Sequence, residues 1–170
     1  MIDIRVAEAK DFEAIWLIFH EVVSAGNAYA FSPNTSRDEA YYLWMELPTT
    51  TYVAVEQDNI VGTYYLKPNL PGLGSHVCNA GFMVAKTARG RGLGRKMGKH
   101  GLQQARIHGF KAMQFNFVIS TNEAAIKLWK SLGFEIVGTL SKACHHQQLG
   151  WVDVYIMYQW LHESEISHDH

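Results

Sequence analysis

Hydrophobic and polar side chains divide the first third of the chain into short elements. Residues 2–7 alternate between apolar and polar, which is the pattern of a half-buried strand. Over residues 11–26, apolar side chains recur every three or four positions and predict an amphipathic helix. Ser36 is a candidate N-cap, with Glu39 at the capping-box position, for a second helix over 36–45.

The same periodicities continue through residue 160. Asp58-Asn59 is a hairpin signal between two strand-like segments. Strands precede, alternate with and follow helices, which favours a mixed α/β domain with a parallel strand–helix–strand unit at its centre. Beyond residue 45 we predict helices over 92–108 and 122–132, and strands over 51–56, 60–66, 76–84, 112–119, 134–140 and 152–160.

The length of the chain, 170 residues, suits one domain with one core. We assign residues 1–161 to that domain and residues 162–170 to a polar C-terminal tail. The N-terminus lacks the features of a signal peptide, and no apolar run approaches the ~20 residues that a membrane helix needs. We therefore expect a cytoplasmic protein in which Cys78 and Cys144 are free, buried thiols.

Charge is distributed unevenly along the chain. The net charge of −1 argues against a general nucleic-acid binder. No Asp or Glu occurs between Asp58 and Glu123, whereas this stretch holds nine lysines and arginines. A local basic field in a nearly neutral protein indicates a compact polyanionic ligand rather than a long phosphate backbone.

The segment Arg-Gly-Arg-Gly-Leu-Gly at residues 89–94 follows a predicted strand and opens a predicted helix. Glycines allow consecutive backbone N–H groups to converge without interference from Cβ atoms. The helix N-terminus adds free N–H donors and a partial positive charge. With Arg95 and Lys96 close by, the segment predicts a cradle for pyrophosphate.

Two nucleotide-binding motifs do not fit this segment. Arg95 stands where a third Rossmann glycine would be, and Gly98-Lys99 has no glycine five residues earlier, as a Walker loop requires. The alternative that this segment is only a structural glycine-rich turn remains possible from the sequence. The predicted helix also contains Gly98 and Gly101, which close approach of a ligand or tight packing against the sheet would explain.

Two motifs in order carry a family resemblance. Arg89, Gly92 and Gly94 match Arg/Gln-x-x-Gly-x-Gly/Ala, and residues 122–134 look like Asn-x-x-Ala-x-x-Leu-Tyr-x-x-x-Gly-Phe. The chain thereby resembles the GNAT superfamily of acyl-CoA N-acyltransferases. The resemblance implies an acetyl-CoA-dependent N-acetyltransferase that needs no metal. It also implies a central mixed, mostly antiparallel sheet of six to seven strands flanked by about four helices.

In this family the strand before the cradle separates from its neighbour and pairs with the pantetheine arm of coenzyme A. The resemblance makes Phe82 and Asn122 the catalytic candidates, with the Phe82 backbone N–H polarising the thioester carbonyl. Transfer is expected to be direct, so Cys78 is not expected to carry an acyl group. The implied cofactor-binding residues are Phe82, Met83, Val84, Arg89, Gly90, Arg91, Gly92, Leu93, Gly94, Arg95, Asn122 and Trp129.

The proton transfers are left open at this point. Many family members use the tyrosine of the second motif as the acid, but this chain has Trp129, whose indole N–H does not ionise at useful pH. Water, another tyrosine or no acid at all remain alternatives. His76 and Glu21 are candidate bases, and His145-His146 is interpreted as a solvated loop pair rather than a metal site.

Two asparagines, Asn79 and Asn116, interrupt the apolar central strands and are either structural amides or part of a polar cavity. The segments around them resemble the fungal azetidine-2-carboxylate N-acetyltransferases, in which the matching asparagines bind the substrate carboxylate. The resemblance therefore implies an amino acid or cyclic imino acid as the acceptor. Tyr29 and Phe31, in a predicted aromatic loop, are candidate substrate contacts or caps of the core.

The leading hypothesis is thus an enzyme that acetylates the amine of a small molecule, with no nucleic-acid or membrane partner. A protein or peptide N-acetyltransferase is the alternative within the same fold, and it would need an open, acidic or extended groove. A non-catalytic acyl-CoA-binding sensor is a third hypothesis, because the usual tyrosine is replaced by Trp129. Dimers are common in the family, so a homodimer is left open.

Overall fold

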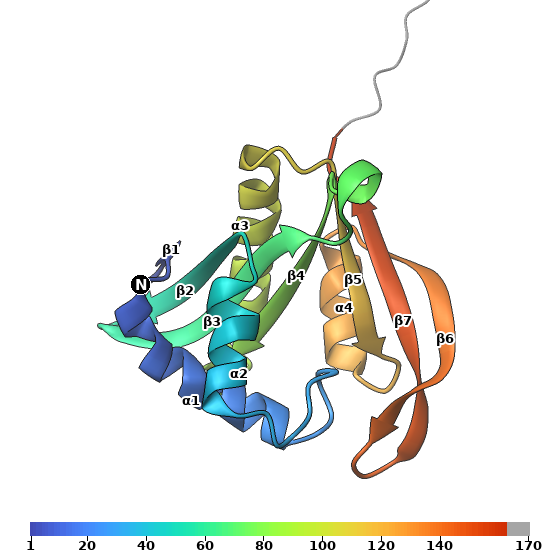
Figure 1. The fold of residues 1–170 in the computed structure, drawn as a ribbon, viewed down its shortest axis with the longest axis horizontal. Helices are drawn as coiled ribbons and strands as arrows, with labels where there is room; N and C mark the ends of the chain where they lie inside the picture. Colours follow the sequence, from blue (N-terminus) through green and yellow to red (C-terminus); the bar gives the residue numbers. More distant parts are fainter. Residues whose placement is uncertain (163–170) are drawn as a thin grey trace, which may run out of the picture.

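Seven strands form one sheet in the computed structural model, which describes residues 1–162 (Figure 1). The strand order is β1-β2-β3-β4-β5-β7-β6, and among the described strands only the neighbours β4 and β5 run parallel. The predicted mixed, mostly antiparallel sheet is confirmed. The strands are β1 (Ile2–Val6), β2 (Thr50–Glu56), β3 (Asn59–Pro68), β4 (Val77–Val84), β5 (Ala112–Ile119), β6 (Glu135–His146) and β7 (Gly150–Trp160).

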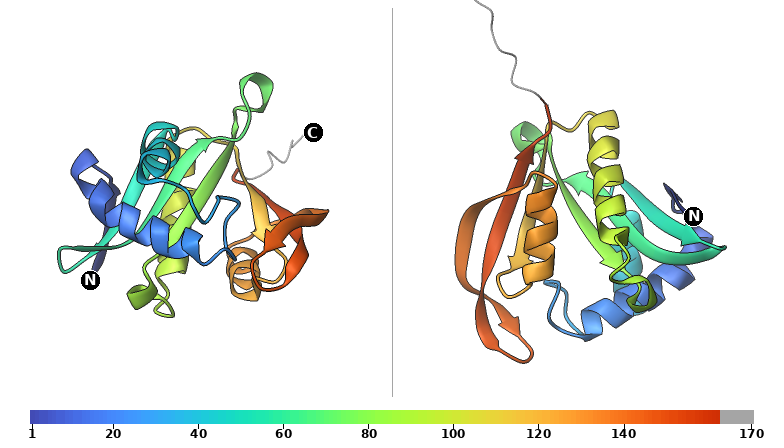
Figure 2. Two further views of the ribbon diagram at one scale, coloured as in Figure 1. Left: turned by 60° about the horizontal axis from the view of Figure 1, so that its bottom comes forward. Right: turned by 180° about the vertical axis from the view of Figure 1, so that it is seen from behind.

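Helices cover both faces of the sheet (Figures 1 and 2). On one face lie α1 (Phe12–Ser24) and α2 (Arg37–Tyr41), which continues into the π-helical turn η2 (Tyr42–Glu46). On the other face lie α3 (Leu93–Ile107) and α4 (Glu123–Ser131). Short 3-10 turns complete the described chain at η1 (Ala9–Asp11), η3 (Gly72–Gly74) and η4 (Lys86–Ala88). No helix among the described residues is long and apolar enough to cross a bilayer.

Most boundaries lie within one or two residues of the predicted ones, and two hairpins differ from their predicted form. The β2–β3 turn lies at Gln57 and Asp58, whose φ angles of 48° and 64° are left-handed, one residue before the predicted Asp58-Asn59. The last hairpin is longer than predicted, so that His145 and His146 end β6 rather than lie in a loop. The N-cap of α2 is as predicted, because the backbone N–H of Glu39 donates to the Ser36 hydroxyl at 3.1 Å.

The interior glycines of α3 are explained by side-chain packing. A Cβ at Gly98 would stand 2.6 Å from Leu132 Cδ1 and 3.1 Å from Trp129 Cζ3, and a Cβ at Gly101 would stand 3.0 Å from Phe82 Cζ. Both glycines are buried. Of the two explanations left open by the sequence, the tight packing of α3 on the sheet and on α4 is the correct one here.

The sheet divides at its centre. Pairing between β4 and β5 extends only from Val77 to Asn79 on β4, and beyond Asn79 the two strands diverge (Figure 1). The Asn79 side chain closes this fork, because its Nδ2 donates to the Gln114 carbonyl at 3.0 Å. A bulge of β5 between Phe115 and Val118 follows on the other side of the fork. The backbone of β4 after Asn79 is therefore left without a neighbouring strand on this side.

Candidate functional site

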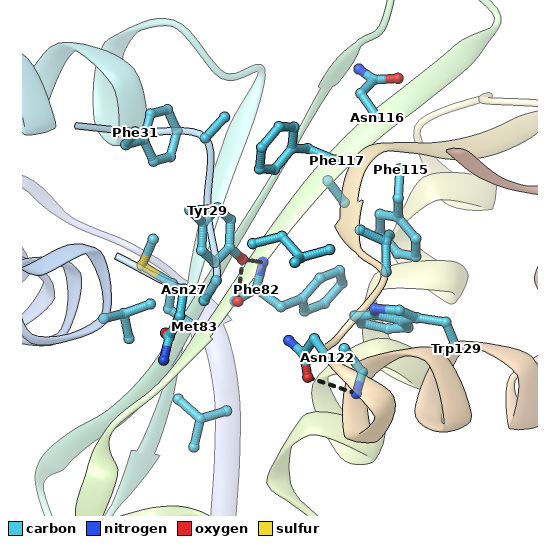
Figure 3. A pocket seen from close by; sticks show the side chains of 18 of the residues that line it. Asn27, Tyr29, Phe31, Phe82, Met83, Phe115, Asn116, Phe117, Asn122 and Trp129 are labelled. Atoms are coloured by element: carbon cyan, nitrogen blue, oxygen red, sulfur yellow. Dashed lines mark hydrogen bonds between the residues drawn. The ribbon is translucent and has the colours of Figure 1, made fainter. Parts of the chain in front are cut away.

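A cavity of about 760 Å³ opens at the fork between β4 and β5. Its wall comes from the end of α1, the loop between α1 and α2, strands β3, β4 and β5, the start of α4 and the last residue of β6. Figure 3 shows the aromatic side chains grouped around its centre. This volume suits a small molecule or part of a cofactor.

The hydroxyl of Tyr29 contacts both backbone groups of Phe82 at the centre of the cavity (Figure 3). It accepts a hydrogen bond from the Phe82 N–H at 2.7 Å and donates one to the Phe82 carbonyl oxygen. Burial raises the pKa of Tyr29. Its ring stacks on Phe31 with centroids 5.8 Å apart, and Phe31 in turn packs against Phe19. Tyr29 and Phe31 thus line the cavity and cap the core at once.

The two predicted asparagines lie at one end of the cavity, but only Asn79 is buried. Its Oδ1 accepts a hydrogen bond from the Tyr65 hydroxyl at 3.1 Å. Asn116 is exposed: its Nδ2 donates to Asn69 Oδ1 at 2.6 Å and its Oδ1 accepts from Gln114 Nε2 at 2.9 Å. Its place between Phe115 and Phe117 in an apolar strand would predict a buried amide, and this expectation is wrong for Asn116.

The predicted pyrophosphate cradle has the backbone geometry that the sequence suggested. Gly90 and Gly92 adopt left-handed φ angles of 75° and 78°, and a Cβ at either position would meet nothing within 4 Å. Gly92 is the N-cap of α3, and the first backbone bond of the helix runs from Lys96 N–H to the Gly92 carbonyl at 3.1 Å. The N–H groups before Lys96 therefore face the open space in front of the helix.

The three arginines around this cradle have different surroundings and partners. Arg89 lines the cavity. Arg91 forms a double hydrogen bond with Glu56, at 2.8 and 3.2 Å, and thereby lowers the pKa of that carboxyl. Arg95 donates to the Ser131 hydroxyl at 2.8 Å. Arg89 is thus the cation of the segment best placed for a ligand, while the roles predicted for Arg91 and Arg95 stay predictions.

Residues of the second motif stand across the fork from β4. Asn122 is the N-cap of α4, with its Oδ1 accepting from the Ala125 N–H at 3.2 Å, and it lines the cavity. Trp129 is 8% exposed and lies between Phe82 and Phe115, with centroids 5.0 and 4.5 Å away. The indole therefore fills core and also forms part of the cavity wall.

Neither candidate base lines the cavity. Glu21 accepts a hydrogen bond from the Lys86 N–H at 2.8 Å, and the His76 ring lies beside Trp160. Cys78 is fully buried in the core away from the cavity, and burial raises its pKa to about 12. Cys78 and Cys144 are both free and buried, as predicted.

The wall also contains polar residues that were not predicted to belong to the site: Asn27, Tyr65, Lys67, Thr121 and His146. His146 was interpreted as solvated, but it is only 8% exposed, and its Nδ1 accepts from the N–H groups of Gln148 and Leu149, both at 3.1 Å. Its loop meets the end of α1, where Gln147 N–H donates to the Gly26 carbonyl at 3.3 Å. No local sequence pattern predicts this contact, because the two segments are far apart in the chain.

Comparisons with known proteins agree with the fold and identify the family. Residues 7–134 match the family model described as the acetyltransferase (GNAT) family. The chain is 33% identical over 157 residues to N-acetyltransferase aca1 of Schizosaccharomyces pombe, covering 81% of this chain and 74% of that protein. These two matches show the family independently of the structure.

Solved structures agree in fold. A GCN5-related N-acetyltransferase from Kribbella flavida is 43% identical, with a TM-score of 0.88 over 94% of this chain and 97% of its own. YncA of Salmonella typhimurium, solved with its cofactor acetyl-CoA, is 26% identical, with a TM-score of 0.81 over 96% of both chains. The predicted fold and enzyme class are confirmed, and the chain belongs to the acetyltransferase (GNAT) family.

Proposed function

We propose that the protein transfers an acetyl group from acetyl-CoA directly to the amine of a small acceptor, an amino acid or a cyclic imino acid. The observation that carries this proposal is the position of the cavity. It opens at the fork where β4 lacks a neighbour, and it joins that exposed backbone to a pocket lined by Tyr29, Phe31 and Asn79.

The residues at the fork fit coenzyme A. Left-handed Gly90 and Gly92 leave open space in front of the first turn of α3, where backbone N–H groups suit a pyrophosphate. Arg89 adds a positive charge on the cavity wall. The unpaired backbone of β4 suits the amide groups of pantetheine, as an added strand would pair with a sheet edge. When bound, acetyl-CoA supplies the activated thioester.

The chain's own groups account for stabilisation of the developing charge. The Phe82 N–H faces the cavity and suits the thioester oxygen, whose negative charge grows as the amine attacks. Loss of one such donor costs roughly 3–4 kcal/mol of barrier. The Tyr29 hydroxyl lies within hydrogen-bond distance of the same N–H, and burial keeps it protonated. Because burial also makes Tyr29 a weaker acid, its hydroxyl suits a hydrogen bond to the departing thiolate, and solvent is left as the proton source where Trp129 cannot serve.

Within residues 1–162, no Asp or Glu lines the cavity, and the charged side chains of its wall are Lys67 and Arg89. Positive charge near an amine disfavours the ammonium form. We infer that the acceptor reacts as the neutral amine and that solvent, not a carboxylate of the enzyme, takes its proton. The same lining argues against a groove for lysine-rich peptides, which would need acidic side chains.

The first experiment is acetyl-CoA-dependent thiol release against azetidine-2-carboxylate, proline, common amino acids, polyamines, aminoglycosides and short peptides, with a control that lacks acceptor. We expect release with amino or imino acids only. Release with peptides alone would contradict the small-acceptor proposal. Binding of acetyl-CoA without transfer to any acceptor would instead favour a sensor.

A further inference from the structure

Lys67 lies near the end of β3 and is partly buried in the wall of the cavity. The register of β3 and β4 places it directly opposite Asn79. Directly opposed residues of an antiparallel pair point to the same face of the sheet. Lys67 and Asn79 are therefore neighbours at the polar end of the cavity.

The Lys67 side chain is oriented by an aromatic neighbour. Its Nζ lies 5.3 Å from the centroid of the Tyr65 ring, a cation–π distance, and the Tyr65 hydroxyl donates to Asn79 Oδ1. Burial lowers the pKa of Lys67. Among the described residues, no carboxylate lies within 4.0 Å of its ammonium, and no Asp or Glu lines the cavity. A partly desolvated ammonium without a counter-ion favours the binding of an anion.

The side-chain amides of Asn79 and Asn116 each have an N–H hydrogen free, whereas their oxygens already accept hydrogen bonds. Asn79 and Asn116 each use one Nδ2 hydrogen on a neighbouring carbonyl oxygen, which leaves one hydrogen of each amide available. Their Oδ1 atoms already accept from Tyr65 and Gln114. This end of the cavity therefore presents an ammonium and two amide N–H groups, a set that suits a carboxylate.

We propose that Lys67 is a specificity-determining residue whose ammonium binds the carboxylate of the acceptor, so that the enzyme selects amines with a neighbouring carboxylate and rejects polycationic amines. This inference rests on the proposed function and names the substrate class of the same site. Asn79 and Asn116 then orient the carboxylate, while Lys67 supplies the charge.

The test compares azetidine-2-carboxylate with azetidine-2-carboxamide as acceptors. The amine of the carboxamide is the weaker base, so a preference for the carboxylate cannot come from amine ionisation. In Lys67→Met we expect the KM for the carboxylate to rise roughly 10- to 100-fold, the range for losing a hydrogen bond to a charged group. The KM values for the carboxamide and for acetyl-CoA should change far less, because neither presents a carboxylate to Lys67. Lys67→Arg should recover most of the carboxylate affinity, and Lys10→Met, at an exposed lysine outside the cavity, is the matched control.

Binding calorimetry with azetidine-2-carboxylate, proline and alanine makes the test independent of turnover. Equal affinity of wild type and Lys67→Met for these acids overturns the inference, and so does a wild type that binds none of them. If the wild type nevertheless acetylates other small amines, the proposed transfer to small amines stands and only the role of Lys67 is lost. If it acetylates no small amine but binds the acids through Lys67, the proposed function fails while the anion site stands.

Discussion

The Tyr29 hydroxyl lies 2.7 Å from the Phe82 nitrogen and also contacts the Phe82 carbonyl oxygen, so one side chain occupies both backbone groups that the fork leaves free. Tyr29 belongs to the loop between α1 and α2, which lines the cavity, whereas Phe82 belongs to the strand proposed to bind the cofactor. A ligand that hydrogen-bonds to Phe82 has to displace this hydroxyl. Cofactor binding and the position of the loop are thereby coupled.

Removing the hydroxyl should therefore strengthen cofactor binding. We expect Tyr29→Phe to lower the Kd for acetyl-CoA by about fivefold, the effect of one hydrogen bond of about 1 kcal/mol that no longer competes for the Phe82 N–H. Calorimetric titration measures this directly. Tyr42→Phe, at an exposed tyrosine of η2, is the control. An unchanged or weaker affinity in Tyr29→Phe would show that the hydroxyl does not compete.

Substitutions at the two glycines that flank α3 distinguish the effect of backbone strain on stability from an effect on cofactor binding. Gly92 and Gly109 flank the helix with φ angles of 78° and 86°, and neither position has an atom within 4 Å of an added Cβ. Gly92→Ala and Gly109→Ala should each lose about 1–2 kcal/mol of unfolding free energy, because alanine is strained in this conformation. Only Gly92→Ala should also lose acetyl-CoA affinity. Denaturant titration and calorimetry check both expectations, and equal affinity in the two variants would place the pyrophosphate elsewhere.

Direct transfer predicts that Cys78 never carries an acetyl group. Since its thiol is fully buried and has a pKa of about 12, the reactive thiolate is scarce at neutral pH. We expect intact-mass spectra after incubation with acetyl-CoA alone to show no acetyl adduct. We also expect Cys78→Ala to keep kcat within about twofold while losing about 1 kcal/mol of stability. An adduct that disappears in Cys78→Ala would establish a covalent route.

The ion pair between Arg5 and Asp11 predicts a specific pH dependence. Its two hydrogen bonds of 2.7 and 3.0 Å lower the pKa of Asp11 below the ordinary value of 3.8, with the Arg5 hydrogen bond as the main cause. A carboxyl whose pKa falls on folding adds stability above its unfolded pKa, and this stability is lost as pH falls through the folded-state pKa. We expect Asp11→Asn to cost about 1–2 kcal/mol at pH 7, with the gap from wild type closing in acid below the ordinary pKa of Asp.

The control for this pair is Arg5→Met, which removes the same hydrogen bonds from the other side. Thermal unfolding at a series of pH values should show that the double variant loses no more than the larger single loss. Additive losses, or a gap that persists in acid, would mean that Asp11 acts through its backbone contact with the Glu8 N–H instead.

Element order, sheet type and the glycine segment could be predicted because each has a local signature. The apolar period of α1, the cap at Ser36 and the glycines at 90 and 92 depend on residues adjacent in the chain. The β2–β3 turn was misplaced by one residue, because Gln57, a poor candidate for a left-handed conformation, adopts one beside Asp58.

The cavity itself could be predicted only in part. Lys67 resembles a surface lysine until β3 is paired with β4 in register and Asn79 is seen to lie opposite. The contact of Tyr29 with Phe82 spans 53 positions of the chain. The bulge that follows Phe115 has no characteristic residue pattern by which the sequence would reveal it. His146 enters the wall only because the β6–β7 turn folds back on the end of α1. Such contacts depend on the assembled sheet and not on local sequence.

The fork also makes the protein two half-sheets, β1–β4 and β5–β7, that share only three paired positions from Val77 to Asn79. A ligand paired along the open side of β4, beyond Asn79, would bridge the two half-sheets and restrict their relative motion. Amide hydrogens that point into the fork, on β4 beyond Asn79 and on β5 beyond Gln114, should then exchange with solvent much faster than those at the three shared positions, until acetyl-CoA slows them. The melting temperature should likewise rise with acetyl-CoA concentration, so that the cofactor serves as a structural part of the sheet it uses.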